Sequence, residues 1–216
     1  MLRMTDVRKT YVEDGKAREV LRGVDATFRI GDAVGILGRN GTGKSTLMRI
    51  MAGVDKPSGG RIERSMSVSW PLGYSGGIHM NLTGADNVRF VARIYSRPAQ
   101  WTLDFVRDFA ELTEEEMSMP VRNYSAGMRA RLSFALSLAV DFDCYLLDEV
   151  TSAGDARFNA KCQQALLSRR RRSAIILVSH NESTVRTFCR YCAVLDKGRL
   201  VFHEDMDQAF AAYQRL

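Results

Sequence analysis

Residues 38–45 read GRNGTGKS and constrain this chain more than any other segment, because they fit the pattern G-x-x-x-x-G-K-[ST]. An apolar run precedes them at residues 33–37, and residues 44–52 carry apolar side chains at helical spacing. This order predicts a buried parallel strand, a glycine-rich loop and an amphipathic helix. Glycines let successive backbone N–H groups turn toward one anion, and the N-terminus of the helix faces the same place. The segment therefore predicts a phosphate-binding loop in a nucleotide site.

Two side chains of this loop have distinct expected roles. Lys44 places a compact positive charge on the β and γ phosphates, and Ser45 offers its hydroxyl to Mg²⁺. The alternative is a glycine-rich turn that holds no ligand. The residues expected to contact the nucleotide here are Gly38, Arg39, Asn40, Gly41, Thr42, Gly43, Lys44, Ser45 and Thr46.

A second apolar run, at residues 144–147, ends in the carboxylates Asp148 and Glu149. A carboxylate at the end of a strand can hold Mg²⁺, so we expect Asp148 to be a metal ligand together with Ser45. A second carboxylate, one residue on, can polarise an attacking water, which makes Glu149 the candidate general base. Taken alone, the same residues are also compatible with a strand end whose acids are solvated.

Composition narrows the class of protein. The chain has 216 residues, of which 45% are hydrophobic and 26% charged, as in ordinary globular domains. Its 31 basic and 25 acidic residues give a net charge of +6, which favours anionic partners without selecting one. No run approaches the roughly 20 apolar residues of a membrane-spanning helix, and residues 1–11 do not resemble a signal peptide. We therefore expect a cytoplasmic chain.

Hydrophobic periodicity predicts β/α alternation at both ends of the chain and helices in its middle. Strands are expected over residues 21–30, 33–37, 67–70, 144–147 and 174–179, with a hairpin over 192–202. Helices are expected over 44–52, 85–96, around 103–110, from 125, around 158–166 and over 206–216. The expected fold class is α/β, with a P-loop NTPase core of a mixed sheet flanked by helices and an inserted helical subdomain.

The four cysteines do not form a secretory disulfide framework. Cys189 and Cys192 make a C-x-x-C pair, which could be half of a zinc site or a redox pair. They also share an apolar stripe at helical spacing with Val185 and Phe188, and free cysteines are commonly buried. We therefore expect both thiols to pack in the core.

Residues 124–128, YSAGM, span the start of the helix expected from 125 and lie upstream of Asp148. Together with the phosphate loop and the acidic strand end, they resemble the signature motif of the ATP-binding subunits of ABC transporters. In that family L-S-G-G-Q closes on the γ-phosphate of a nucleotide held by the opposite subunit. Ser125 and Gly127 match, whereas the glutamine is lost. Without the resemblance, Ser125 is simply a helix N-cap.

The resemblance extends to three further positions. It implies that His180, after the apolar strand 174–179, contacts the γ-phosphate, and that Tyr11 stacks on adenine. Residues 151–155, TSAGD, are similar to the family's D-loop, with Asp155 matching its acid. A lone histidine at a strand end and a tyrosine in a strand can also be purely structural. The implied fold is a single ATP-binding domain over residues 1–216, with a RecA-like core and antiparallel part at about 1–71 and 141–216 and a helical subdomain at about 84–140.

Departures from the family pattern point to a subfamily. The family's glutamine between core and helical subdomain is missing, because no glutamine precedes Gln100. The segment LTGADNV at 82–88, together with Val150 after the acidic pair, is similar to polysaccharide exporters, and in particular to capsular polysaccharide export ATP-binding proteins. This implies an ATPase that uses ATP and Mg²⁺, forms a homodimer and drives integral membrane permease subunits. It also implies further polysaccharide export proteins as partners, and a peripheral place on the cytoplasmic face of the bacterial inner membrane.

Other interpretations stay open at this stage. The polymer could be O-antigen or teichoic acid. A non-transport ABC ATPase acting on nucleic acid or ribosomes is compatible with the basic run Arg169–Arg172, although a solvated helix end explains that run and we expect no nucleic-acid partner. A P-loop kinase would explain the phosphate loop and Asp148, but not the spacing of Ser125, Asp148 and His180.

Overall fold

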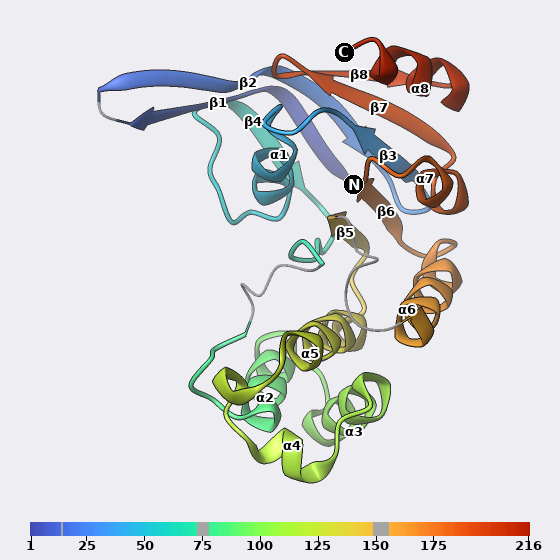
Figure 1. Ribbon diagram of the computed structural model, residues 1–216. Coiled ribbons are helices and arrows are strands. Elements are labelled where there is room, and N and C mark those ends of the chain that lie inside the picture. Colours follow the sequence, from blue (N-terminus) through green and yellow to red (C-terminus); the bar gives the residue numbers. More distant parts are fainter. Residues whose placement is uncertain (14, 73–77, 149–155) are drawn as a thin grey trace. The chain divides into compact units, whose positions relative to one another are not determined.

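A computed structural model describes residues 1–13, 15–72, 78–148 and 156–216 (Figure 1). The chain divides into two compact units, which we call the sheet unit and the helical unit. The sheet unit comprises Met1–Pro71, Asp143–Glu149 and Leu167–Leu216, and the helical unit comprises Leu72–Phe142 and Val150–Leu166.

A five-stranded, mostly parallel sheet forms the centre of the sheet unit. Its strand order is β5-β6-β3-β7-β8, and only β8 runs antiparallel to its neighbour. The strands β3, β5 and β6 are apolar runs that are almost wholly buried, as expected when helices cover both faces. The strands are β3 (Ala33–Leu37), β5 (Cys144–Asp148), β6 (Ala174–Val178), β7 (Tyr191–Asp196) and β8 (Arg199–His203).

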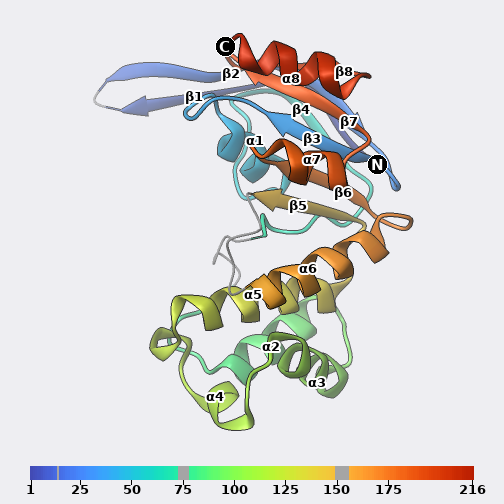
Figure 2. The ribbon, with the colours of Figure 1, turned by 45° about the vertical axis from the view of Figure 1, so that its right-hand side comes forward.

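A three-stranded antiparallel sheet accompanies it, with β1 (Leu2–Glu13) between β2 (Lys16–Phe28) and β4 (Gly59–Arg64). The main hydrophobic core lies between the two sheets and includes the helix α1 (Lys44–Met51), whose Leu47, Met48, Ile50 and Met51 are fully buried. The helices α7 (Glu182–Phe188) and α8 (Met206–Gln214) pack on the parallel sheet, as Figure 2 shows. The parallel strands that carry the site are therefore covered on both faces.

The helical unit contains α2 (Gly84–Ile94), α3 (Ala99–Ala110), α4 (Glu114–Ser118), a short 3-10 turn η2 (Val121–Asn123), α5 (Ala126–Val140) and the first part of α6 (Ala156–Arg169). Its core includes three aromatic rings from different helices. Phe109 lies 6.1 Å from Phe134 and 5.9 Å from Phe158 between ring centroids. Among the described residues, no helix has both the length and the apolar character needed to cross a membrane.

One expected strand was wrong, and one strand was missed. Residues 67–70 form no strand but a single bridge, Val68 to Cys144. Side-chain oxygens replace backbone carbonyls as hydrogen-bond acceptors there. Ser69 Oγ accepts from Leu146 N at 2.9 Å, and Asp143 Oδ2 accepts from Ser67 N at 2.8 Å. The strand β4 at Gly59–Arg64 was not expected, because its Gly-Gly start and charged residues are typical of a turn.

The cysteine pair is buried as expected, but not on one helix. Cys189 caps the end of α7, whereas Cys192 lies on β7. Their sulfurs surround Gly35, where an added Cβ would lie 3.1 Å from Cys192 Sγ and 3.5 Å from Cys189 Sγ. Burial raises the pKa of the Cys192 thiol to about 11, and it also raises that of Cys189. Both therefore act as small apolar groups at neutral pH.

Candidate nucleotide-binding site

The loop of residues 38–45 leaves β3 and enters α1 directly. Gly41 and Gly43 have φ angles of 81° and 105°, which L side chains rarely adopt. Gly43 is also the N-cap of α1, so no side chain caps the first turn of the helix. The helix dipole favours negative charge at this turn, whose N–H groups are the donors that an anion would meet.

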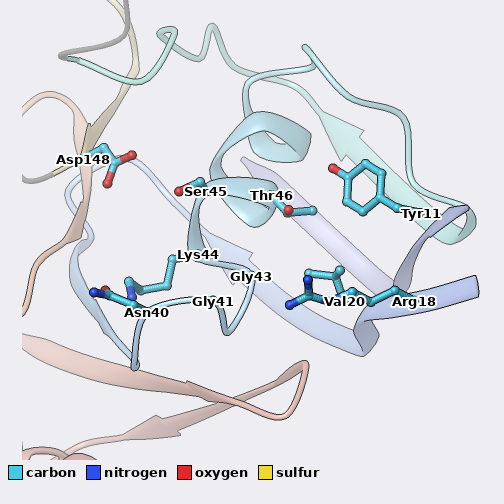
Figure 3. A pocket seen from close by; sticks show the side chains of 10 residues that line it. All are labelled: Tyr11, Arg18, Val20, Asn40, Gly41, Gly43, Lys44, Ser45, Thr46 and Asp148. Atoms are coloured by element: carbon cyan, nitrogen blue, oxygen red, sulfur yellow. The ribbon is translucent and has the colours of Figure 1, made fainter. Parts of the chain in front are cut away.

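A pocket of about 640 Å³ opens at this loop within the sheet unit (Figure 3). Expected contact residues line most of it, and they come from β1, the phosphate loop, α1 and the end of β5. The lining residues are Tyr11, Arg18, Val20, Asn40, Gly41, Gly43, Lys44, Ser45, Thr46 and Asp148. The structure thus brings together groups that are up to 137 positions apart in the chain, between Tyr11 and Asp148.

The side chain of Lys44 folds back over the loop. Its Nζ donates to Gly38 O at 2.6 Å and to Arg39 O at 2.9 Å. The ammonium is therefore held at the loop that would receive the phosphates. Arg39 and Thr42 line a neighbouring hollow rather than the main pocket. Gly38 lies against β7, because a Cβ there would stand 2.6 Å from Leu195 O.

Tyr11 lines the other end of the pocket, where β1 pairs with β2 and Tyr11 lies opposite Arg18. Its hydroxyl donates to Asp55 Oδ2 at 2.9 Å, and Arg49 binds the same carboxylate oxygen at 2.9 Å. Lys9 Nζ lies 4.9 Å from the centre of the ring. These contacts fix the orientation of an aromatic ring beside the phosphate loop, which is the arrangement that stacking on a base requires.

The oxygen groups expected to hold Mg²⁺ belong to the same pocket. Asp148 is the last residue of β5, and Ser45 lies in the first turn of α1. Figure 3 shows the Ser45 hydroxyl on the side of the pocket where the Asp148 carboxylate lies. A hydroxyl and a carboxylate are oxygen ligands that suit Mg²⁺, so the residues present fit this ion.

Three further residues were expected at the site: His180 and Glu149 as catalytic residues and Asp155 as a nucleotide contact. His180 follows β6 and is exposed, between Ser179, whose Oγ accepts from Asn181 N at 3.0 Å, and Asn181, which caps α7. It does not line the pocket around Lys44. Glu149 and Asp155 lie outside the described residues. The roles of all three stay predictions.

In the helical unit, Ser125 is the N-cap of α5 and accepts a hydrogen bond from Met128 N at 3.1 Å. Ser125 is exposed, and a Cβ added at Gly127 would meet only Ser125 Oγ, at 3.9 Å. Tyr124 anchors this end from inside: its hydroxyl donates to Glu116 O at 2.6 Å, and burial, with the nearby Glu116, raises its pKa to about 12. The helix end is thus an open, firmly held group of N–H donors.

Residues 21–152 match the protein family described as ABC transporter. The chain belongs to the ABC transporter family. It is 46% identical to the capsule polysaccharide export ATP-binding protein CtrD of Neisseria meningitidis serogroup B over all of both chains. It is 38% identical to the polysialic acid transport ATP-binding protein KpsT of Escherichia coli, over 100% of this chain and 99% of that protein.

The structure is similar to solved ATP-binding cassettes of this family. A dimeric post-hydrolysis structure of the cassette MJ0796, bound to ADP and Pi, superposes with a TM-score of 0.80, covering 93% of this chain and 96% of that one. At 22% identity this likeness shows the fold alone. The expected ABC ATPase fold, with an antiparallel N-terminal part and a parallel core, is thereby confirmed.

Two residues that line the pocket around Lys44 were not predicted from the sequence, Arg18 and Val20 on β2. The sequence offers little indication of their role, because an arginine or a valine in a strand is common and belongs to no short nucleotide-binding motif. The register of the hairpin is what brings them to the site, since Arg18 lies opposite Tyr11. That register depends on irregularities in β1, including a shift between Lys9 and Thr10, which no short sequence pattern indicates.

Replacing Gly43 with alanine is expected to weaken both stability and nucleotide binding. The new Cβ would lie 2.7 Å from Val20 Cγ1, at a φ angle of 105°. We expect the free energy of unfolding to fall by about 1–3 kcal/mol and ATP affinity to fall with it, measured by denaturant melts and nucleotide titration. Gly31→Ala is the control, because Gly31 has a similar φ of 88° with open space around it, outside the pocket. Normal affinity in Gly43→Ala would contradict this reading of the loop.

Proposed function

We propose that this chain is the ATP-hydrolysing subunit of an ABC transporter that exports capsular polysaccharide. The observation that carries the proposal is the full-length match to CtrD, a capsule polysaccharide export protein. The pocket around Lys44 supplies the chemistry that such a subunit needs, because it combines an anion-binding loop, an aromatic ring and a carboxylate. Family membership and the pocket together support an ATPase.

In this proposal the triphosphate binds to the N–H groups at the start of α1, with Lys44 on its β and γ phosphates. Lys44 exchanges its bonds to the loop carbonyls of Gly38 and Arg39 for bonds to phosphate oxygens. Tyr11 stacks on the base from β1, held by its bond to Asp55. The N–H dipoles at the start of α1 and the ammonium of Lys44 thus stabilise the negative charge of the phosphates.

Mg²⁺, when bound with the nucleotide, would neutralise phosphate charge, and Ser45 and Asp148 would hold it. Glu149 is proposed to orient and deprotonate the attacking water, and His180 to contact the γ-phosphate. These roles rest on the order of the motifs along the chain and on the resemblance, with the position of Asp148 in the pocket as support.

Two copies of the chain are proposed to sandwich the nucleotides. Ser125 and Gly127 of one subunit would meet the γ-phosphate held by the other, with Asp155 near the shared interface. Support comes from the exposed N-terminus of α5, which offers N–H groups and a serine hydroxyl. ABC cassettes are known as dimers, as in the solved structure of MJ0796.

We also propose that the chain lies at the cytoplasmic side of the membrane and that helix α2 contacts the permease. Phe90 and Ile94 are 55% and 57% exposed on this helix, one turn apart. Asn87 is buried and holds the preceding segment, donating to His79 O at 3.0 Å and accepting from His79 N at 2.7 Å. A firmly held helix with exposed apolar residues fits a protein partner better than solvent.

Reversing the charge of Arg89 and Arg93 together is expected to weaken assembly with the permease without altering ATP binding. Both arginines are exposed on α2 beside Phe90, and Arg89 forms an ion pair with Asp86, one turn earlier, at 3.0 Å. Copurification of the permease should fall at least about tenfold. Glu115→Arg, on α4, is the control for a charge change elsewhere in the helical unit. Unchanged copurification would refute this contact.

The function as a whole is tested by removing the gene for this chain from its own cells. We expect polysaccharide to accumulate inside and the surface capsule to disappear, with restoration by the intact gene but not by Lys44→Met. The measurement is surface immunostaining compared with polysaccharide in the cell lysate. Loss of O-antigen or teichoic acid with an intact capsule would overturn the assignment of the polymer.

A further inference from the structure

The start of helix α2 and the segment before Ser125 lie side by side in the helical unit. Residues 80–84 run antiparallel to residues 119–122, with an isolated bridge between Thr83 and Pro120. Three backbone hydrogen bonds join them: Arg122 N donates to Met80 O at 2.8 Å, Val121 N to Leu82 O at 3.0 Å and Gly84 N to Met119 O at 3.2 Å. The second segment ends three positions before Ser125, the N-cap of α5. The start of α2 is therefore bonded to the chain that leads into this N-cap.

The buried side chain of Asn87 binds the same segment to the body of α2. It accepts from His79 N at 2.7 Å and donates to His79 O at 3.0 Å and to Thr83 O at 2.9 Å. Breaking such bonds inside a protein is costly, because each buried polar group would be left without its partner. Residues 79–83 are thus held by α2 on one side and by residues 119–122 on the other.

The side chain of Tyr124 adds a second connection. It is 3% exposed, and its hydroxyl donates to Glu116 O at 2.6 Å. The same hydroxyl lies against Gly84, the first residue of α2, where an added Cβ would stand 2.2 Å from the Tyr124 oxygen and 3.3 Å from Met117 O. The φ angle of Gly84 is not in the left-handed region, so the backbone does not require glycine here. The missing side chain instead makes room for the hydroxyl.

Tyr124 is also bonded to the first turn of α5. Tyr124 O accepts from the guanidinium of Arg129, and Tyr124 N donates to Val121 O at 3.0 Å. The next residue, Ser125, accepts from Met128 N at 3.1 Å through its hydroxyl. Tyr124 and the first turn of α5 therefore form one bonded group, which ends in the exposed Ser125. A shift of Tyr124 would shift this helix end.

We propose that Tyr124 and Gly84 are positioning residues, which set the place of the N-terminus of α5 from the start of α2. The inference rests on the proposed function, in which α2 contacts the permease and Ser125 meets the γ-phosphate held by the partner subunit. It adds a connection between these two contacts, which we call the α2–α5 route. A displacement of α2 by the permease passes to Ser125 through the backbone bonds and the Tyr124 hydroxyl, because hydrogen-bond networks between rigid elements carry such coupling. The whole route lies within the helical unit.

Gly84→Ala tests the contact directly. The new Cβ would lie 2.2 Å from the Tyr124 oxygen, where an ordinary contact needs at least 3.4 Å, so the ring and the first turn of α5 must shift by about 1 Å. We expect kcat for ATP hydrolysis to fall about 10- to 100-fold, as it does when a group at the site is misplaced by that distance. The affinity of the monomer for ATP should stay unchanged, because the pocket around Lys44 is untouched. Phosphate release at saturating ATP and nucleotide titration measure both, and normal turnover would refute the contact.

Tyr124→Phe supplies the rescue. It removes the oxygen that the new Cβ would meet and leaves Glu116 O with a donor, because that carbonyl also accepts from Met119 N at 3.1 Å. The double variant, Gly84→Ala with Tyr124→Phe, should therefore turn over ATP to within about threefold of the natural chain. A double variant as slow as Gly84→Ala would mean that the alanine acts through another neighbour, such as Met117, and would overturn the role of Tyr124.

Val106→Ala separates positioning from a general loss of stability. Val106 is fully buried on α3 of the same unit, so its truncation lowers the melting temperature. We expect normal turnover in this variant at temperatures where it is folded. If Val106→Ala and Gly84→Ala lost turnover in proportion to their loss of melting temperature, the role of Gly84 would be structural and the proposal would be wrong.

Export by cells that carry these variants separates the α2–α5 route from the proposed function. Copurification of the permease with Gly84→Ala should be normal, because the exposed Arg89, Phe90 and Arg93 of α2 are unchanged. Surface polysaccharide should fall at least about tenfold and return in the double variant. Normal export by Gly84→Ala would refute the route and leave the exporter assignment standing. If the intact chain itself supported no export, the exporter assignment would fail, and the route with it.

Discussion

Lys44→Met is expected to bind nucleotide weakly and to hydrolyse ATP about 10²- to 10³-fold more slowly, while folding normally. The substitution keeps the length of the side chain and removes the ammonium that donates to the phosphate loop, at 2.6 Å from Gly38 O. Removing one fixed positive charge that stabilises a developing anion lowers the rate by a factor of that size. The N–H groups at the start of α1 remain, so some affinity for the phosphates should persist.

Phosphate release and nucleotide titration measure these effects, and thermal melting checks the fold. Lys56→Ala is the control, because Lys56 is exposed and lies outside the pocket lining. A Lys44→Met protein that hydrolyses ATP at the normal rate would contradict the role of the pocket. A protein that melts much earlier would instead mean that the bonds of Lys44 to Gly38 O and Arg39 O stabilise the loop more than we expect.

The central strands of this fold are predictable because they are short, apolar runs that must be buried on both faces of a sheet. The strands β3, β5 and β6 fall within one residue of the expected segments at each end. Buried parallel strands can be recognised in this way, since both faces must be apolar. The N-cap of α5 at Ser125 was likewise predictable from local hydrogen-bonding chemistry.

The errors occur where side chains or tertiary contacts replace a local pattern. At residues 67–70 an apolar-looking segment makes only one bridge, because Asp143 and the serines satisfy its backbone partners. β4 is a charged edge strand that only its pairing with β1 defines. Cys192 matched a helical stripe by spacing, yet it belongs to β7, since the chain leaves α7 at Cys189. Periodicity alone cannot detect such a change of element.

The candidate site also contains residues that a local motif predicts and residues that only the pairing of strands brings to it. The phosphate loop could be found from sequence because its chemistry needs glycines, a lysine and a serine in one short stretch. Arg18 and Val20 enter the pocket through the pairing of β1 with β2, which depends on irregular register.

Glu149→Gln is expected to bind ATP at least as well as the natural chain and to hydrolyse it about 10²- to 10⁴-fold more slowly. Glu149 follows Asp148, whose carboxylate lines the pocket at the end of β5. Glutamine keeps the shape of the side chain but cannot accept a proton from water. Because binding would persist while turnover stops, two copies should remain associated around ATP.

Size-exclusion chromatography with light scattering measures this dimer, in the presence of Mg²⁺ with ATP and then with ADP. We expect an ATP-dependent dimer in Glu149→Gln and mostly monomer with ADP. Adding Ser125→Arg, which places a large cation at the exposed N-cap of α5, should abolish the dimer without weakening ATP binding to the phosphate loop. Full hydrolysis by Glu149→Gln would remove Glu149 as the base. A dimer that survives Ser125→Arg would mean that this helix end does not meet the partner's nucleotide.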